Sequence, residues 1–201
     1  MARRFCKCPT WWIRIDEKTG LKKFGGGTSA GTSIAALKCI LALSASIDFS
    51  TRKAKLSLSD LEKLTGLSRP KVIDGLKLLT VLLIIKVDKT SHVHEYELTE
   101  APQDANWAKV PYERIRKHLS EIPNRGVIPL TALKIYLLLV SIRPNVSDSV
   151  PVGYDTLVEY LGVQRSQIRS ALDILYSHTL IRITLSDESK ERHNVYTISG
   201  L

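Results

Sequence analysis

Cysteine is scarce in this chain of 201 residues, and its three cysteines, Cys6, Cys8 and Cys39, are too few for a disulfide framework. An odd and sparse cysteine count is typical of proteins in a reducing compartment. Long hydrophobic runs are missing too: no apolar stretch approaches the roughly 18–20 residues that cross a bilayer. The basic start at Met1 is followed by no apolar signal core. The sequence therefore predicts a soluble, cytoplasmic protein without membrane association.

The sequence also lacks the motifs of catalytic and metal sites. Cys6 and Cys8 have the wrong spacing for a zinc knuckle, and the imidazoles of His92 and His94 have no third ligand nearby. The glycine-rich stretch 24–29 has no lysine where a phosphate-binding loop needs one, so we interpret it as a flexible link. No pair of carboxylates and no nucleophile motif is set by the spacing. We expect a protein that is not an enzyme and that uses no metal or other cofactor.

Acidic residues are outnumbered. The chain has 29 Lys and Arg against 20 Asp and Glu, a formal net charge of +9, and a sequence pI near 9.5. Most of the excess lies in residues 1–100. Such a balance favours a polyanionic partner, because binding neutralises phosphates and releases counterions. Charge alone does not identify that partner, but 44% hydrophobic and 24% charged residues indicate an ordinary globular chain.

An internal repeat is the most informative feature that is present. Shifting the sequence by 96 residues aligns it with itself without a gap over most of its length. Identical pairs include Lys38 with Lys134, Leu61 with Leu157, Gly66 with Gly162, Arg69 with Arg165, Leu76 with Leu172 and Ile85 with Ile181. The period is longer than the 20–50 residues of solenoid repeats. We therefore predict two related domains, 1–100 with a basic N-terminal arm, and 101–201.

Each copy predicts the same order of elements: helix, short strand, helix, tight turn, helix and two-stranded hairpin. In the first copy we expect helices over 30–46, from Ser59 to Gly66 and from Ser68, a strand over 54–58, and hairpin strands over 83–87 and 93–98. Ser59 and Glu62 fit a capping box. In the second copy we expect helices over 129–142, 154–161 and 165–176, with hairpin strands over 180–185 and 194–199. The predicted class is α+β, mainly α.

Both copies resemble the helix-turn-helix of bacterial winged-helix DNA-binding proteins. The resemblance rests on Leu61, Leu64, Gly66, Leu67, Ser68, Arg69 and Val72, and on Leu157, Tyr160, Leu161, Gly162, Val163, Arg165 and Ile168. The stretches 12–15 and 107–111 are also alike, and we expect a short strand before the first helix of each copy. The tandem arrangement resembles the replication initiators of plasmids and phages. It implies two tandem winged helix-turn-helix domains that bind double-stranded DNA.

In such a domain the start of the third helix and the tip of the hairpin meet DNA. In the first copy these positions hold Ser68, Arg69, Lys71, Lys77, Lys89 and His92. In the second copy they hold Gln164, Arg165, Ser166, Gln167, Arg169, Lys190, Arg192 and His193. Arg and Gln make bidentate contacts to guanine and adenine, so we expect the second copy to read bases and the lysine-rich first copy to grip phosphates. Solvated helix faces and turns, and a disordered arm at Arg3, Arg4 and Lys7, are the alternatives.

The leading hypothesis is a site-specific binder of double-stranded DNA in plasmid or phage replication, with partners among replication or transcription proteins. A transcriptional regulator is the first alternative, because DNA binding looks the same in both roles. A tandem winged-helix scaffold for protein interactions is the second. The stretch 81–85 is unusually apolar, which suggests a homodimer through the first domain.

Overall fold

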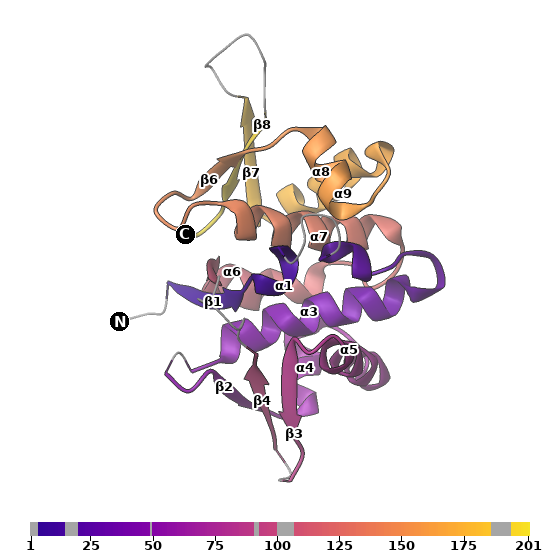
Figure 1. Cartoon of the computed structure of the whole chain (residues 1–201), viewed down its shortest axis with the longest axis vertical. Coiled ribbons are helices and arrows are strands. Elements are labelled where there is room, and N and C mark those ends of the chain that lie inside the picture. The colour runs from indigo at the N-terminus through magenta and orange to yellow at the C-terminus, as the bar shows by residue number, and fades with distance from the viewer. Residues whose placement is uncertain (1–3, 15–19, 49, 91–92, 100–106, 186–193) are drawn as a thin grey trace.

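The computed structural model describes residues 4–14, 20–48, 50–90, 93–99, 107–185 and 194–201. These residues form α-helices, short 3-10 helices (η) and short antiparallel strands. Helical residues outnumber those in strands, so the predicted combination of helices and strands is confirmed. Figure 1 shows helices across the middle of the molecule, with the strand Phe5–Pro9 beside them and the other labelled strands toward the two ends.

The first half of the chain has one strand and several short helices before its longest helix. In chain order its elements are β1 (Phe5–Pro9), α1 (Trp11–Arg14), η1 (Leu21–Lys23), η2 (Gly27–Ser29), α3 (Ala30–Ser46), β2 (Lys53–Leu56), α4 (Leu58–Thr65), α5 (Arg69–Val81), β3 (Ile85–Asp88) and β4 (His94–Leu98). The helix predicted over 30–46 is confirmed at both ends, and the other helices and the hairpin lie within a few residues of their predicted bounds.

The second half follows the same plan. Its elements are β5 (Trp107–Pro111), α6 (Tyr112–His118), η3 (Leu119–Glu121), α7 (Val127–Ile142), β6 (Ser149–Pro151), α8 (Tyr154–Leu161), α9 (Arg165–Ser177), β7 (Ile181–Leu185) and β8 (Asn194–Ile198). From α3 to β4 and from α7 to β8 the order of elements is identical. The repeat in the sequence is therefore also a repeat of secondary structure.

Each half contains a three-stranded antiparallel sheet with its last strand in the middle, ordered β2-β4-β3 and β6-β8-β7. Tyr96 of β4 pairs with Ala54 and Val87, and its counterpart Tyr196 in β8 is likewise fully buried. A central strand that buries a large aromatic ring against its helices fixes the register, since a shift of one residue would expose the ring. A third sheet consists of β1 and β5 alone and joins the two halves.

The centre of the molecule is formed by α3 and α7, which pack against each other (Figure 1). Both helices are apolar on nearly every face and are buried over almost their whole length, as expected for helices that are surrounded by other elements. Buried residues of both halves form one hydrophobic cluster. The predicted domain boundary between residues 100 and 101 lies outside the described residues.

One sequence expectation needs correction here. Among the described residues, the helical stretch Gly27–Ser46 has the length and hydropathy of a membrane span, although no such run was expected. Small and β-branched residues mixed with Lys38 made this stretch look less apolar than it is on average. Within its apolar window, 78% of the residues are buried inside the protein, which is the usual situation of a core helix.

The start of α4 also differs from its prediction. Ser57, not Ser59, is the N-cap: its Oγ accepts a hydrogen bond from the backbone N–H of Asp60, and Asp60 accepts one from the Ser57 N–H. The pattern of Ser followed by an acidic residue three positions later occurs twice here, with Ser59 and Glu62 as the second instance. Because β2 ends at Leu56, the helix begins at the earlier one.

The prediction of a strand over 12–15 is wrong for residues 12–14, the part of this stretch that the structure describes. Residues Trp11–Arg14 form α1, in which the consecutive side chains Trp12 and Ile13 are both buried. The strand instead is β1, where Cys6 and Cys8 are buried and their neighbours are partly exposed, with the alternation of a strand. Lys7 therefore belongs to a paired strand and not to a disordered arm. Residues 1–3 lie outside the described residues.

Candidate nucleic-acid interface

The two helix pairs α4–α5 and α8–α9 are built around the same turn. Gly66 ends α4 at φ +67° and Gly162 ends α8 at φ +61°, which confirms the predicted left-handed positions that favour glycine. Below the turn, the side chains of Leu61 and Val72 are fully buried, as are their counterparts in the second half. The second helix of each pair, α5 or α9, is thus anchored by one edge, and its opposite edge faces solvent.

Arg69, the first residue of α5, reaches back to α4. Its guanidinium donates to Ser59 Oγ at 2.9 Å and forms an ion pair with Glu62 at 3.2 Å. The side chain is nevertheless 53% exposed. Ser59 and Glu62, which the sequence assigned to a helix cap, thus hold the arginine at the start of the third helix.

Arg165 occupies the same place at the start of α9. Its guanidinium forms an ion pair with Asp155 and lies 5.6 Å from the ring centroid of Tyr154. Asp155 is the counterpart of Ser59, so both arginines contact the same position of the preceding helix. The Arg165 side chain is 61% exposed. In each half an exposed cation is therefore held in place before any ligand arrives, which lowers the entropy lost on binding.

The other predicted residues of α5 spread over its exposed edge. Ser68 is the exposed N-cap residue, but its side chain makes no capping hydrogen bond. Lys71 forms an ion pair with Asp74 at 3.6 Å, and its amine lies close to Gly31 at the start of α3. Lys77 lies two turns further along the helix and is exposed.

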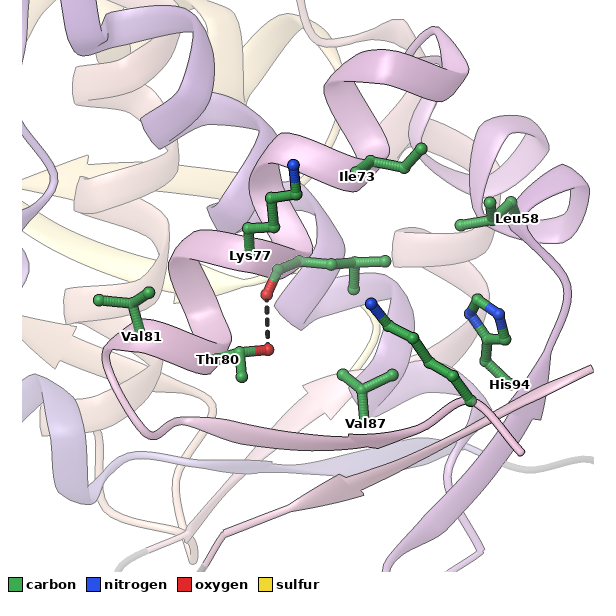
Figure 2. A pocket seen from close by; sticks show the side chains of 9 residues that line it. Leu58, Ile73, Lys77, Thr80, Val81, Val87 and His94 are labelled. Carbon is green, nitrogen blue, oxygen red and sulfur yellow. Dashed lines mark hydrogen bonds between the residues drawn. The ribbon is translucent and has the colours of Figure 1, made fainter. Parts of the chain in front are cut away.

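Lys77 and Lys89 both border a groove of about 700 Å³ between α5 and the hairpin of the first half. Its remaining lining residues are mainly apolar: Leu58, Ile73, Leu76, Thr80, Val81, Val87 and His94. Figure 2 shows Ile73 and Lys77 projecting from α5, with Val87 and His94 on the strands opposite them. The structure therefore brings together a predicted helix residue and a predicted hairpin residue at one concave surface.

In α9 the predicted residues differ in their exposure. Gln164 is the N-cap residue, and it is exposed together with Ser166 and Arg169. Gln167 is half-buried and accepts a long hydrogen bond of 3.5 Å from Thr131 on α7. The side chains available for contact at the start of α9 are therefore those of residues 164, 165, 166 and 169.

Four predicted residues of the hairpin tips, His92, Lys190, Arg192 and His193, lie outside the described residues. Of the predicted hairpin residues, Lys89 falls on the part of the chain that the structure describes, as does His94 beside the turn. The hairpin contribution to the interface therefore stays a prediction for both halves.

The sequence reasoning missed a pair of buried lysines behind this interface. Lys38 Nζ donates to the carbonyl oxygen of Thr65, and Lys134 Nζ to that of Leu161, so each lysine caps the C-terminus of the helix before the turn. Burial lowers the pKa of each amine from 10.5 to about 8. The sequence did contain a signal for them: each of the two apolar helices has a lysine near its middle, and both lysines occupy the same position of the repeat.

Within the described residues, Lys38 makes two further hydrogen bonds that are not found for its counterpart Lys134. The Lys38 amine also donates to the carbonyl oxygen of Ile122 at 2.6 Å and to Asn124 Oδ1 at 2.7 Å. Asn124 in turn donates to the carbonyl oxygen of Gly66 at 2.6 Å. Residues Ile122 and Asn124 of the second half thus support the turn between α4 and α5.

The alternative sites that the sequence raised have structural explanations. Cys6, Cys8 and Cys39 are buried free thiols, and burial raises the pKa of Cys8 to about 11 and that of Cys39 to about 12. The stretch 24–29 contains η2, and Ser33 Oγ donates to the carbonyl oxygen of Gly25 at 2.8 Å. Among the residues that the structure describes, no three His, Cys, Asp or Glu side chains are grouped to hold a metal ion.

Comparison with known proteins adds no further name to these features. No protein-family model matches the chain, and a search of curated proteins finds no similar sequence.

Proposed function

We propose that the protein is a tandem winged-helix protein that binds specific sites in double-stranded DNA. The observation that carries the proposal is the pair of arginines, Arg69 and Arg165, at the first position of α5 and α9. Each is exposed, and each is held by the preceding helix. Arginine at this end of a recognition helix makes bidentate contacts to guanine in the major groove.

Three further features support this proposal. Each helix pair is followed by a β-hairpin, as in a winged helix. The net charge of +9 favours a polyanion. Both α5 and α9 lie toward the same side of the molecule in Figure 1, so that one duplex is a suitable ligand for both. Within this proposal, Arg165 and its neighbours on α9 read bases, whereas Lys71, Lys77 and Lys89 neutralise phosphates.

For the biological role we propose initiation or control of replication on a plasmid or phage, with transcriptional regulation as the alternative. The tandem arrangement of two similar units supports the first role. Both roles need the same binding to DNA, so a measurement of DNA recognition tests what they share. Origin-dependent replication in a host that supplies the protein in trans then separates them.

A protein-interaction scaffold is the competing function from a different class. The apolar lining of the groove beside Ile73 and Val87 favours it, because such surfaces are used for partner helices. The exposed arginines at equivalent positions favour DNA instead. Charge reversal of Arg69 and Arg165 distinguishes the two functions. If the protein binds DNA, the substitutions abolish DNA binding. If it is a scaffold, they leave binding of the protein partner unchanged.

The proposal is tested by selecting duplexes from a random library over several rounds and measuring affinity by fluorescence anisotropy at about 0.15 M salt. We expect a selected motif that is bound about a thousandfold more tightly than unselected duplex. Salt-sensitive binding without a motif would reduce the protein to a non-specific DNA binder. Absence of binding would make the scaffold the leading function.

A further inference from the structure

The contacts between the two halves are reciprocal. Strand β1 pairs with β5 in antiparallel register, and Lys7 stands opposite Lys109 at the centre of both strands. The Lys7 amine lies 4.5 Å from the ring centroid of Trp107, and the Lys109 amine lies 5.1 Å from that of Phe5. In each strand the third residue is the cation and the first is the aromatic ring. Exchanging the halves therefore reproduces the contact.

A second pair of contacts obeys the same rule. The short helix η3 of the second half covers the turn of the first, where a β-carbon on Gly66 would lie 2.7 Å from the carbonyl oxygen of Ser120. The short helix η1 of the first half covers the turn of the second, where a β-carbon on Gly162 would lie 3.1 Å from the Lys22 side chain. Each half thus supports the helix pair of the other half.

Reciprocal contacts of this kind define a two-fold relation, as in an isologous dimer interface. The pseudo-two-fold axis passes between Lys7 and Lys109 and between α3 and α7, the equivalent helices that pack against each other. Figure 1 agrees: the β3–β4 and β7–β8 hairpins point in opposite directions, while α5 and α9 lie toward one side. A chain of two units related by translation would not make these contacts.

We infer that a single chain recognises two DNA half-sites in inverted orientation, as an imperfect palindrome. The inference rests on the proposed function. A protein two-fold axis is matched by the two-fold symmetry of the DNA backbone, so two-fold related recognition helices read inverted half-sites, whereas translated ones read direct repeats. A second copy of the chain is not needed for this symmetry, because the two units are already present in one polypeptide.

The two half-sites are expected to be related but unequal. The first residue of both recognition helices is arginine, which predicts a base shared by both arms. Four residues later the two helices differ, with Ile73 in α5 and Arg169 in α9. A side chain that donates several hydrogen bonds and one that donates none select different bases. The two half-sites should therefore have the same base where the arginine contacts them and different bases next to it.

The test uses the full chain and the selected motif. Three duplexes of equal length carry its two arms in inverted order, in direct order at the same spacing, and with one arm scrambled. We expect the inverted duplex to bind about tenfold or more tightly than either control, and sedimentation to show one chain per duplex. Tighter binding to the direct repeat, or two chains per inverted site, would overturn the inference and leave the proposed function intact.

Variants assign the arms. The guanine expected opposite the arginine is replaced in one arm at a time, and Arg69→Ala and Arg165→Ala are measured on each duplex. If each unit reads one arm, Arg69→Ala loses its effect when one arm is altered, and Arg165→Ala when the other is. Both arginines coupling to the same arm would contradict the inverted arrangement. Failure to select any motif would instead remove the proposed function and the inference with it.

Discussion

The two halves of the molecule share a buried frame but differ on the surface that faces the proposed ligand. In the groove of the first half, Ile73 and Lys77 project from α5. The same positions in α9 hold Arg169 and Asp173. An apolar residue is thus exchanged for a cation, and a cation for an anion, without a change in the order of the elements. The comparison teaches that the repeat preserves the buried positions that orient the third helix, together with the arginine at its start, and varies the exposed positions further along that helix.

Differences inside the frame are fewer and more specific. Lys38 makes three hydrogen bonds to backbone and side-chain oxygens, whereas one is found for Lys134. Gly75 in α5 is replaced by Ala171 in α9. Both differences involve the long central helix of each half: Lys38 and Lys134 belong to α3 and α7, and Gly75 packs against α3. They allow the two halves to be compared by pairs of matched variants.

The largest expected effect is that of Lys38→Met. The substitution removes a charged donor from three acceptors in the interior, and we expect a loss of about 2–4 kcal/mol in the free energy of unfolding. Lys134→Met removes one longer hydrogen bond of 3.3 Å and should cost only about 1 kcal/mol. Urea denaturation followed by circular dichroism measures both. Equal losses would show that the extra contacts to Ile122 and Asn124 do not stabilise the protein.

The next effect concerns the approach of α5 to α3. A β-carbon on Gly75 would lie 2.6 Å from the carbonyl carbon of Ala35, so Gly75→Ala forces the helices apart. Such overpacking costs about 1–3 kcal/mol, which outweighs the gain of about 1 kcal/mol in helix propensity. The reverse change, Ala171→Gly, should cost about 1 kcal/mol in the second half. Both substitutions therefore destabilise, and a more stable Gly75→Ala variant would contradict the close approach.

For DNA binding, the sharpest comparison is between Arg165→Ala and Arg69→Ala. On the selected motif, Arg165→Ala should cost about 1–3 kcal/mol and relax specificity at one base. Its folding cost should be small, since exposed ion pairs contribute about 0–1 kcal/mol, and circular dichroism serves as the control. Arg69→Ala should likewise weaken binding to the selected motif and relax specificity at one base, which lies in the other arm of the motif. An equal loss on every duplex for Arg165→Ala would remove its role in base reading.

The buried lysines also predict a dependence of stability on pH. Burial lowers the pKa of Lys134 in the folded protein to about 8, below the 10.5 of the unfolded chain. Between these values the unfolded state binds more protons, so the contribution of Lys134 to stability rises by about 2–3 kcal/mol from pH 7 to pH 10. The readout is the difference between the wild type and Lys134→Met from pH 7 to 10. This difference cancels the opposing titration of Cys8 and Cys39, and a flat difference would contradict the shift.

Much of this frame was predictable from the sequence. The helix over Ala30–Ser46, the turn glycines Gly66 and Gly162, and the positions of both arginines followed from periodicity and from the repeat itself. Local patterns failed where a tertiary contact decided between two equally good choices. The strand at Phe5–Pro9 is defined by its pairing with β5, and the N-cap of α4 by the end of β2. The ion pairs of the arginines required the angle between helices, which no local pattern contains.

The smallest expected effect separates Lys71 from its counterpart Gln167. Lys71 is exposed and paired only with Asp74 among the contacts found in the described residues, at 3.6 Å. If it neutralises one phosphate, Lys71→Ala weakens binding to all duplexes to a similar degree and lowers the slope of log K against log salt by about one. Gln167→Ala is the matched control and should leave that slope unchanged, because the residue carries no charge. An unchanged slope for Lys71→Ala would place its amine away from the DNA and shift the phosphate contacts of the first half to Lys77 and Lys89.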